Sequence, residues 1–107
     1  MLQVVIDLKQ NKNTKRRISL IFRIYNEGIA FCYTFKSMND RDKVHIIREN
    51  TEFCFQDNHK TWVTYTAQGK YEEVRLSDVK DGCERPLTIS IDNGPYISIG
   101  EARLVDY

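Results

Sequence analysis

Apolar and polar residues alternate along much of this chain, most clearly between positions 18 and 35. Large apolar residues occupy the even positions from Ile18 to Ile24, whereas from Ile29 to Phe35 the odd positions are apolar or aromatic. A two-residue period is typical of a strand with one buried face. The intervening segment 26–28 reads Asn-Glu-Gly, which favours a tight turn. We therefore expect a β-hairpin whose aromatic and aliphatic stripes face the core.

The same period returns in the segment from Pro86 to Tyr107, on both sides of an Asp-Asn-Gly-Pro turn at positions 92–95. This predicts a terminal hairpin, in which an unbroken second strand would turn Glu101 toward the face of Ile97 and Ile99. A carboxylate without a partner is costly on an apolar face. Either Gly100 forms a bulge that re-aims a solvated Glu101, or a cation or hydrogen-bond donors meet the carboxylate.

Shorter apolar runs predict further strands, separated by polar turns about every 8 to 12 residues. They cover positions 2–8, 44–47, 51–55, 62–65 and 71–76. No segment carries a sustained helical stripe, and no internal repeat is visible. The prediction is an all-β fold of about seven to nine short, mostly antiparallel strands, forming a single β-sandwich domain over residues 1–107.

Composition narrows the range of partners. The 107 residues include 16 basic and 15 acidic side chains, a net charge of +1, so no overall field favours nucleic acid or an anionic membrane. Five basic residues lie within positions 9–17, but without interleaved aromatics this segment favours a solvated loop over a nucleic-acid contact. The chain shows no secretion signal and no apolar run long enough for a membrane span, so we expect a soluble, untargeted chain.

Cysteine and histidine positions give no metal or disulfide pattern. Cys32, Cys54 and Cys83 are odd in number and widely spaced, which favours small buried side chains; a single disulfide stays open in an oxidising compartment. His45 and His59 lack neighbouring ligands at metal spacing and are expected at the surface or rim.

No catalytic group is predicted. Glu72 and Glu73 are adjacent, so in a strand their carboxylates point to opposite faces and cannot act together on one bond. The chain also lacks a nucleophile elbow, a P-loop and a dinucleotide fingerprint.

Several stretches, in this order, resemble the N-terminal domain of glycoside hydrolase family 97. They are IFRIYNEGIAFCYTF (21–35), TEFCF (51–55), Trp62, the Tyr71–Glu72 pair, PLTI (86–89) and YISIGEARLVDY (96–107). The resemblance covers the chain from about Ile18 onward. It implies part of a mutarotase-like super-sandwich that is packed, in the family, against a catalytic (β/α)8 barrel.

The family cleaves α-linked glucosides or galactosides, holds calcium at its active site and is typically secreted to the periplasm of gut Bacteroidetes. Its catalytic carboxylates belong to the barrel, so the resemblance implies a non-catalytic, internal piece that lacks the beginning of the sandwich. Glu101 matches a glutamate that this domain lends to the calcium site. Two departures are Cys32, where arginine is common, and Gly100, where a bulkier residue is usual.

We therefore expect a structural, domain-packing role without enzymatic activity or a cofactor of its own, with Glu101 as one ligand of an incomplete calcium site. A partial sandwich exposes sheet edges and apolar surface, which predicts self-association. The alternative is a free-standing carbohydrate-binding module in which Trp62, Tyr65 or Tyr71 stacks on an α-linked oligosaccharide. Periplasmic or secreted localisation is implied by the resemblance alone.

Overall fold

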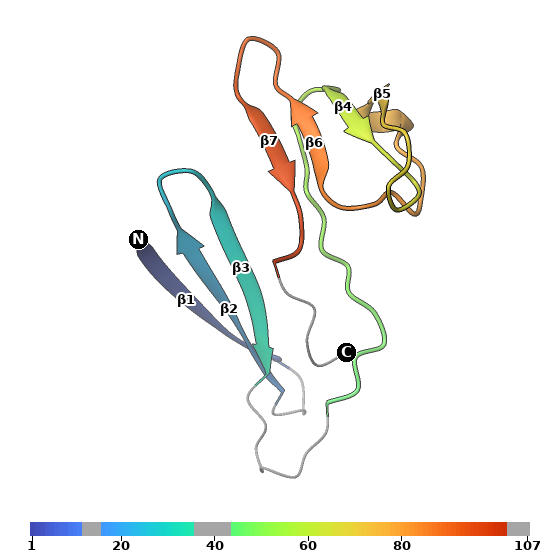
Figure 1. The fold of residues 1–107 in the computed structure, drawn as a ribbon. Helices are drawn as coiled ribbons and strands as arrows, with labels where there is room; N and C mark the ends of the chain where they lie inside the picture. The colour runs from blue at the N-terminus through green and yellow to red at the C-terminus, as the bar shows by residue number, and fades with distance from the viewer. Residues whose placement is uncertain (12–15, 36–43, 103–107) are drawn as a thin grey trace. The chain divides into compact units, whose positions relative to one another are not determined.

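The chain forms seven strands and one short 3₁₀ turn within residues 1–11, 16–35 and 44–102, the part that the computed structural model describes. The strands make two antiparallel sheets (Figure 1). The chain divides into two compact units, Met1–Asn50 and Thr51–Tyr107, and each unit contains one sheet. The predicted all-β class and antiparallel pairing are confirmed. Two antiparallel sheets are the layers from which a β-sandwich is built.

No helix among the described residues has the length and apolar character needed to cross a membrane.

The first unit holds a three-stranded sheet in the order β1-β2-β3, with β1 at Leu2–Lys9, β2 at Arg17–Ile24 and β3 at Ile29–Phe35. The hairpin predicted from the alternation is confirmed. Its turn is closed by the Tyr25 backbone N–H, which donates to the Gly28 carbonyl at 2.8 Å. Register places the even-numbered apolar residues of β2, from Ile18 to Ile24, directly opposite apolar residues of β1 and β3, so these three stripes share one face.

The apolar face of this sheet is only half-buried at its centre and exposed at its ends. Phe22 and Phe31 pack with ring centroids 5.8 Å apart, while Ile29 at the end of the face is 68% exposed. The side chains of these stripes were predicted to be buried in the core, and that prediction overestimated their burial. A single layer of three strands cannot cover its own face; an apolar face is buried only against another layer.

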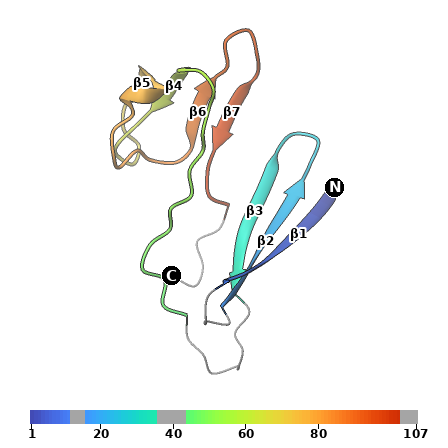
Figure 2. The same ribbon diagram turned by 180° about the vertical axis from the view of Figure 1, so that it is seen from behind.

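The second unit holds a four-stranded sheet in the order β5-β4-β6-β7 (Figure 2). Its strands are β4 at Lys60–Val63, β5 at Glu72–Arg75, β6 at Leu87–Ser90 and β7 at Tyr96–Ile99; the 3₁₀ turn η1 is Leu76–Asp78. The terminal hairpin is confirmed as β6–β7. Its turn is held by the Gly94 N–H, which donates to the Ile91 carbonyl at 2.9 Å. A Cβ on Gly94 would stand 2.8 Å from a methyl carbon of Ile91, so a larger residue there would force Ile91 to shift.

The core of the second unit lies on one face of this sheet. Thr61, Val63 and Ile89 are fully buried, and the Thr61 hydroxyl donates to the Val74 carbonyl at 3.1 Å. His59 is also buried, with its ring edge-on to Phe55 at 6.1 Å and its Nδ1 without a hydrogen-bond partner. The expectation that His59 lies at the surface was wrong, whereas His45 is exposed as predicted.

Two predicted strands are absent. Segments 44–47 and 51–55 are described in full and contain no strand. Their apolar side chains are largely exposed: Ile47 is 90% and Phe53 51% exposed. The short apolar runs suggested strands, but a strand also needs a neighbour to satisfy its backbone, and neither sheet includes these segments.

The cysteines are free thiols and less buried than predicted. Cys32 and Cys54 are exposed and Cys83 is half-buried. Cys32 lies on the face of β3 opposite the apolar stripe, because its partner in β2 is Ile21. The expectation of burial was therefore wrong for Cys32 and Cys54. The prediction of one domain over residues 1–107 stays a prediction.

Candidate functional site

Glu101 lies just beyond the terminal hairpin and forms an ion pair with Arg85. The two residues meet because β6 and β7 are antiparallel: Leu87 pairs with Ile99, so the chain entering β6 runs beside the chain leaving β7. Strand β7 ends at Ile99, so Glu101 is not a strand residue. Of the two sequence alternatives, the structure supports a cationic partner for the carboxylate.

Solvent reaches both members of this pair. The side chains of Arg85 and Glu101 are 54% and 39% exposed. An exposed ion pair of this kind contributes only about 0–1 kcal/mol to stability. The Glu101 carboxylate is therefore open to exchange its partner.

A complete metal site is not formed in the part of the chain described. No group of three or more His, Cys, Asp or Glu side chains there could hold a metal ion. Calcium usually takes about six to eight oxygen ligands, of which one carboxylate supplies one or two. Glu101 and its surroundings do not fit calcium as a self-contained site.

The outward face of the second sheet gathers aromatic and polar side chains. Register places eight residues on this face, opposite the face that carries Thr61 and Ile89: Lys60, Trp62, Glu73, Arg75, Thr88, Ser90, Tyr96 and Ser98. Trp62 from β4 and Tyr96 from β7 meet across β6, with ring centroids 5.9 Å apart and ring planes tilted by 47°. Trp62 is half-buried, while Tyr96 is 69% exposed.

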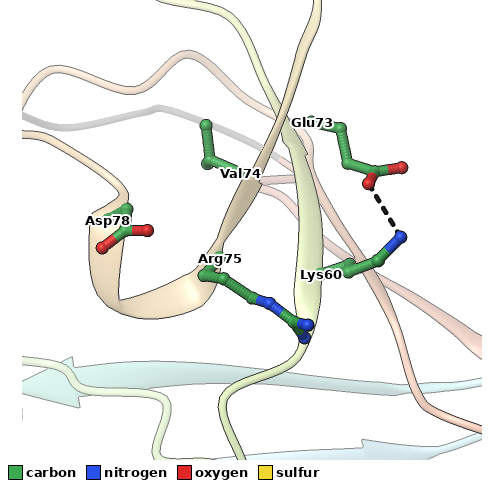
Figure 3. Close-up of a pocket in the computed structure, with 5 residues that line it drawn as sticks. All are labelled: Lys60, Glu73, Val74, Arg75 and Asp78. Atoms are coloured by element: carbon green, nitrogen blue, oxygen red, sulfur yellow. Dashed lines mark ion pairs between the residues drawn. The ribbon is translucent and has the colours of Figure 1, made fainter.

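Charged side chains lie at the β5 end of this face and line a shallow depression (Figure 3). Lys60 Nζ stands 2.9 Å from Glu73 Oε1, and Arg75 donates to the Asn58 carbonyl at 3.1 Å. Figure 3 shows Asp78 on the turn after β5, apart from the Lys60–Glu73 pair. These charges hold β4, β5 and the turn together, and they form no acid–base pair around a reacting atom.

Trp62, Tyr65 and Tyr71 were each considered as a sugar-stacking residue, and whether any of them contacts sugar stays a prediction. The Tyr65 hydroxyl accepts a hydrogen bond from the Lys80 backbone N–H at 3.0 Å, and Tyr71 is 53% exposed. Neither ring pairs with Trp62 in the part of the chain described; Tyr96 does. Sequence reasoning missed Tyr96, although its position just after the 92–95 turn already placed it opposite Ser90.

The two antiparallel sheets define an all-β fold class. The family model described as "Glycosyl-hydrolase 97 N-terminal" matches residues 1–107, the whole chain. The chain therefore belongs to the N-terminal domain family of glycoside hydrolase family 97, and the match includes the first strand, which the resemblance from Ile18 left out. No solved structure matches the chain.

Family membership indicates the general role of this chain in its parent protein. The N-terminal domain is not the catalytic module of family 97 proteins, and in the parent protein it accompanies the catalytic domain. The chain is thus a non-catalytic domain of a family 97 protein.

Proposed function

We propose that this domain has a packing role in its parent protein and uses the apolar face of β1–β2–β3 to contact a neighbouring layer. One observation carries the proposal: the face is continuous over three strands and contains no charged residue. It consists of Leu2, Val4, Ile6, Leu8, Ile18, Leu20, Phe22, Ile24, Ile29, Phe31, Tyr33 and Phe35.

The exposure and chemistry of the face support this role. Leu2 is 60%, Ile6 43% and Phe35 44% exposed, so the described structure leaves much apolar area to bury. Contiguous apolar patches of this kind mark interaction surfaces, and depletion of charge is typical of interface cores. The opposite face is polar by comparison: Ser19 donates to Asp7, and Arg23 donates to Gln3 at 3.1 Å.

We further infer that Glu101 serves as one calcium ligand in a site that the catalytic domain completes. Two observations support this. Its carboxylate is 39% exposed, and its partner, Arg85, is itself largely in solvent. Replacing one exposed guanidinium costs little, so a divalent cation held by other ligands can take its place.

The first sheet, with its apolar face and its edge strands, also supports self-association of the isolated chain. Strands β1 and β3 are the edges of their sheet. Edge strands offer unpaired backbone groups, and β1 is exposed along its entire length. A second copy can therefore occupy surface that the catalytic domain would otherwise cover.

Binding to a separately produced family 97 catalytic domain tests the packing role. Ile6 lies on the apolar face and Val5 on the opposite face, at 43% and 51% exposure, so Ile6→Lys and Val5→Lys are matched variants. We expect a complex by isothermal titration calorimetry, weakened at least about tenfold by Ile6→Lys, because the interface would bury an unpaired ammonium group. Val5→Lys should bind like the unaltered chain. Equal affinities for the two variants, or no complex at all, would overturn the packing proposal.

A further inference from the structure

The outward face of β4, β6 and β7 has a composition that the packing role does not explain. At its centre, Trp62 and Tyr96 form a ring pair with one largely exposed member. The opposite face of the same sheet carries the buried Thr61 and Ile89. The ring pair is therefore on the solvent side of the sheet and is not part of the core.

Hydroxyl groups surround the two rings. Thr88 lies between Trp62 and Ser98 in one cross-strand row, and Ser90 is paired with Tyr96 in the next. The three hydroxyls belong to Thr88, Ser90 and Ser98, and none of them forms a hydrogen bond to another group in the part of the chain described. Each can donate to and accept from a ligand.

The charged side chains beside the rings do not form a surface that favours an ionic ligand. Lys60 is paired with Glu73 at 2.9 Å, Arg75 donates to the Asn58 carbonyl, and the chain as a whole carries a net charge of +1. Nucleic-acid binding depends on a basic surface that neutralises phosphates, and this face does not present one. Aromatic rings with neutral hydroxyls instead match a ligand that has both C–H faces and hydroxyl groups.

We infer that the Trp62–Tyr96 pair, with Thr88, Ser90 and Ser98, forms a carbohydrate-binding surface for a chain of α-linked hexoses. Each ring contacts the C–H face of one sugar unit, and the strand hydroxyls bond to the sugar hydroxyls. This role goes beyond packing and uses a different sheet.

The angle between the Trp62 and Tyr96 ring planes favours one type of glycosidic linkage. Planes inclined by 47° cannot both lie parallel to a flat, extended chain such as β-1,4-linked glucose. In α-1,4-linked glucose, successive units turn relative to one another, and two neighbouring units can meet rings set at an angle. A ring separation of 5.9 Å suits adjacent units and not distant ones.

The competing explanation is that the rings only stabilise the sheet as a cross-strand pair. Ligand titration separates the two explanations, because Trp62 is the sole tryptophan of the chain and its emission reports on this position alone. Maltoheptaose and cellohexaose are the probes, added to the 107-residue chain.

We expect a saturable change in Trp62 emission with maltoheptaose, with Kd on the order of 1 mM, and a much smaller response to cellohexaose. Tyr96→Ala should weaken maltoheptaose binding about three- to tenfold, the range for one lost ring contact. Tyr71→Ala is the matched control, since Tyr71 is also an exposed tyrosine of the same unit, and it should leave the affinity unchanged.

Circular dichroism checks that both variants are folded, and ligand-observed NMR of maltoheptaose gives a second measurement independent of fluorescence. No saturable response to maltoheptaose, or equal weakening by Tyr71→Ala, would overturn the inference. Equal affinity for cellohexaose would overturn the assigned linkage. None of these outcomes affects the packing role, which is tested with variants on β1.

Discussion

The Glu101 carboxylate shows how one residue depends on a neighbour far away in sequence. Arg85 is 16 positions earlier and reaches Glu101 because β6 and β7 lie side by side. The two chain segments do not need a glycine at position 100 to lie this close together. A Cβ on Gly100 would be 3.7 Å from the Pro86 Cβ, which is an ordinary contact. The ion pair therefore depends on the hairpin and not on a special backbone conformation at Gly100.

We predict that the isolated chain binds calcium only weakly, with Kd above about 1 mM, because Glu101 alone supplies too few oxygens. Isothermal titration calorimetry measures this directly. Arg85→Ala, which frees the carboxylate, should not create a site, since the other ligands are still missing. Micromolar binding by either chain would contradict the prediction.

Among the elements, the turn that follows β4 is held by hydrogen bonds from both its backbone and a side chain. The Gly69 N–H donates to the Thr66 carbonyl at 2.9 Å, and the Thr64 hydroxyl donates to the same carbonyl at 3.2 Å. Gln68 adopts a φ of 58° in this turn. The Glu84 N–H then donates to the Thr64 carbonyl at 2.8 Å, which ties the segment after η1 to the end of β4.

A side chain at Gly69 would break this arrangement. A Cβ there would stand 2.7 Å from the Thr64 hydroxyl and 2.8 Å from the Thr66 carbonyl oxygen. We predict that Gly69→Ala lowers the free energy of unfolding by about 1–3 kcal/mol, the range for overpacking. Gly28→Ala, where nothing lies within 4 Å, is the control and should change it by less than about 1 kcal/mol. Urea denaturation measures both, and equal effects would contradict the role of Gly69.

In the molecule as a whole, the two sheets differ in how their faces are used. The second sheet buries Val63 and Ile89 and turns rings and hydroxyls to solvent, whereas the first presents an apolar face with exposed ends. Burial is therefore concentrated in the second unit. We therefore expect the first unit to depend more on a partner surface, which is the physical basis of the proposed packing role and of the predicted self-association.

We predict that the isolated chain self-associates and that Ile29→Lys weakens this association about tenfold, because it places an ammonium group on the apolar face. Ala30→Lys is the neighbouring control on the opposite face of β3 and should leave association unchanged. Sedimentation velocity over a concentration series measures the effect. A monomer at every concentration would contradict the prediction.

Sequence alone determined the all-β class and both hairpins. The alternation in β2, in β3 and around the 92–95 turn involves residues that are close in sequence. A two-residue period on both sides of a turn-forming segment is enough to predict a hairpin. The ordered stretches from Ile21 to Tyr107 also gave the family, which the match over residues 1–107 confirms.

Tertiary structure decided which segments become neighbours. The apolar runs at 44–47 and 51–55 resemble strands locally but join neither sheet. The pairing of β4 with β6 brings Trp62 to Tyr96 and not to Tyr65 or Tyr71. The reason is physical: the pattern along a strand records which face is apolar, whereas the choice of neighbour depends on backbone hydrogen bonds between strands distant in sequence.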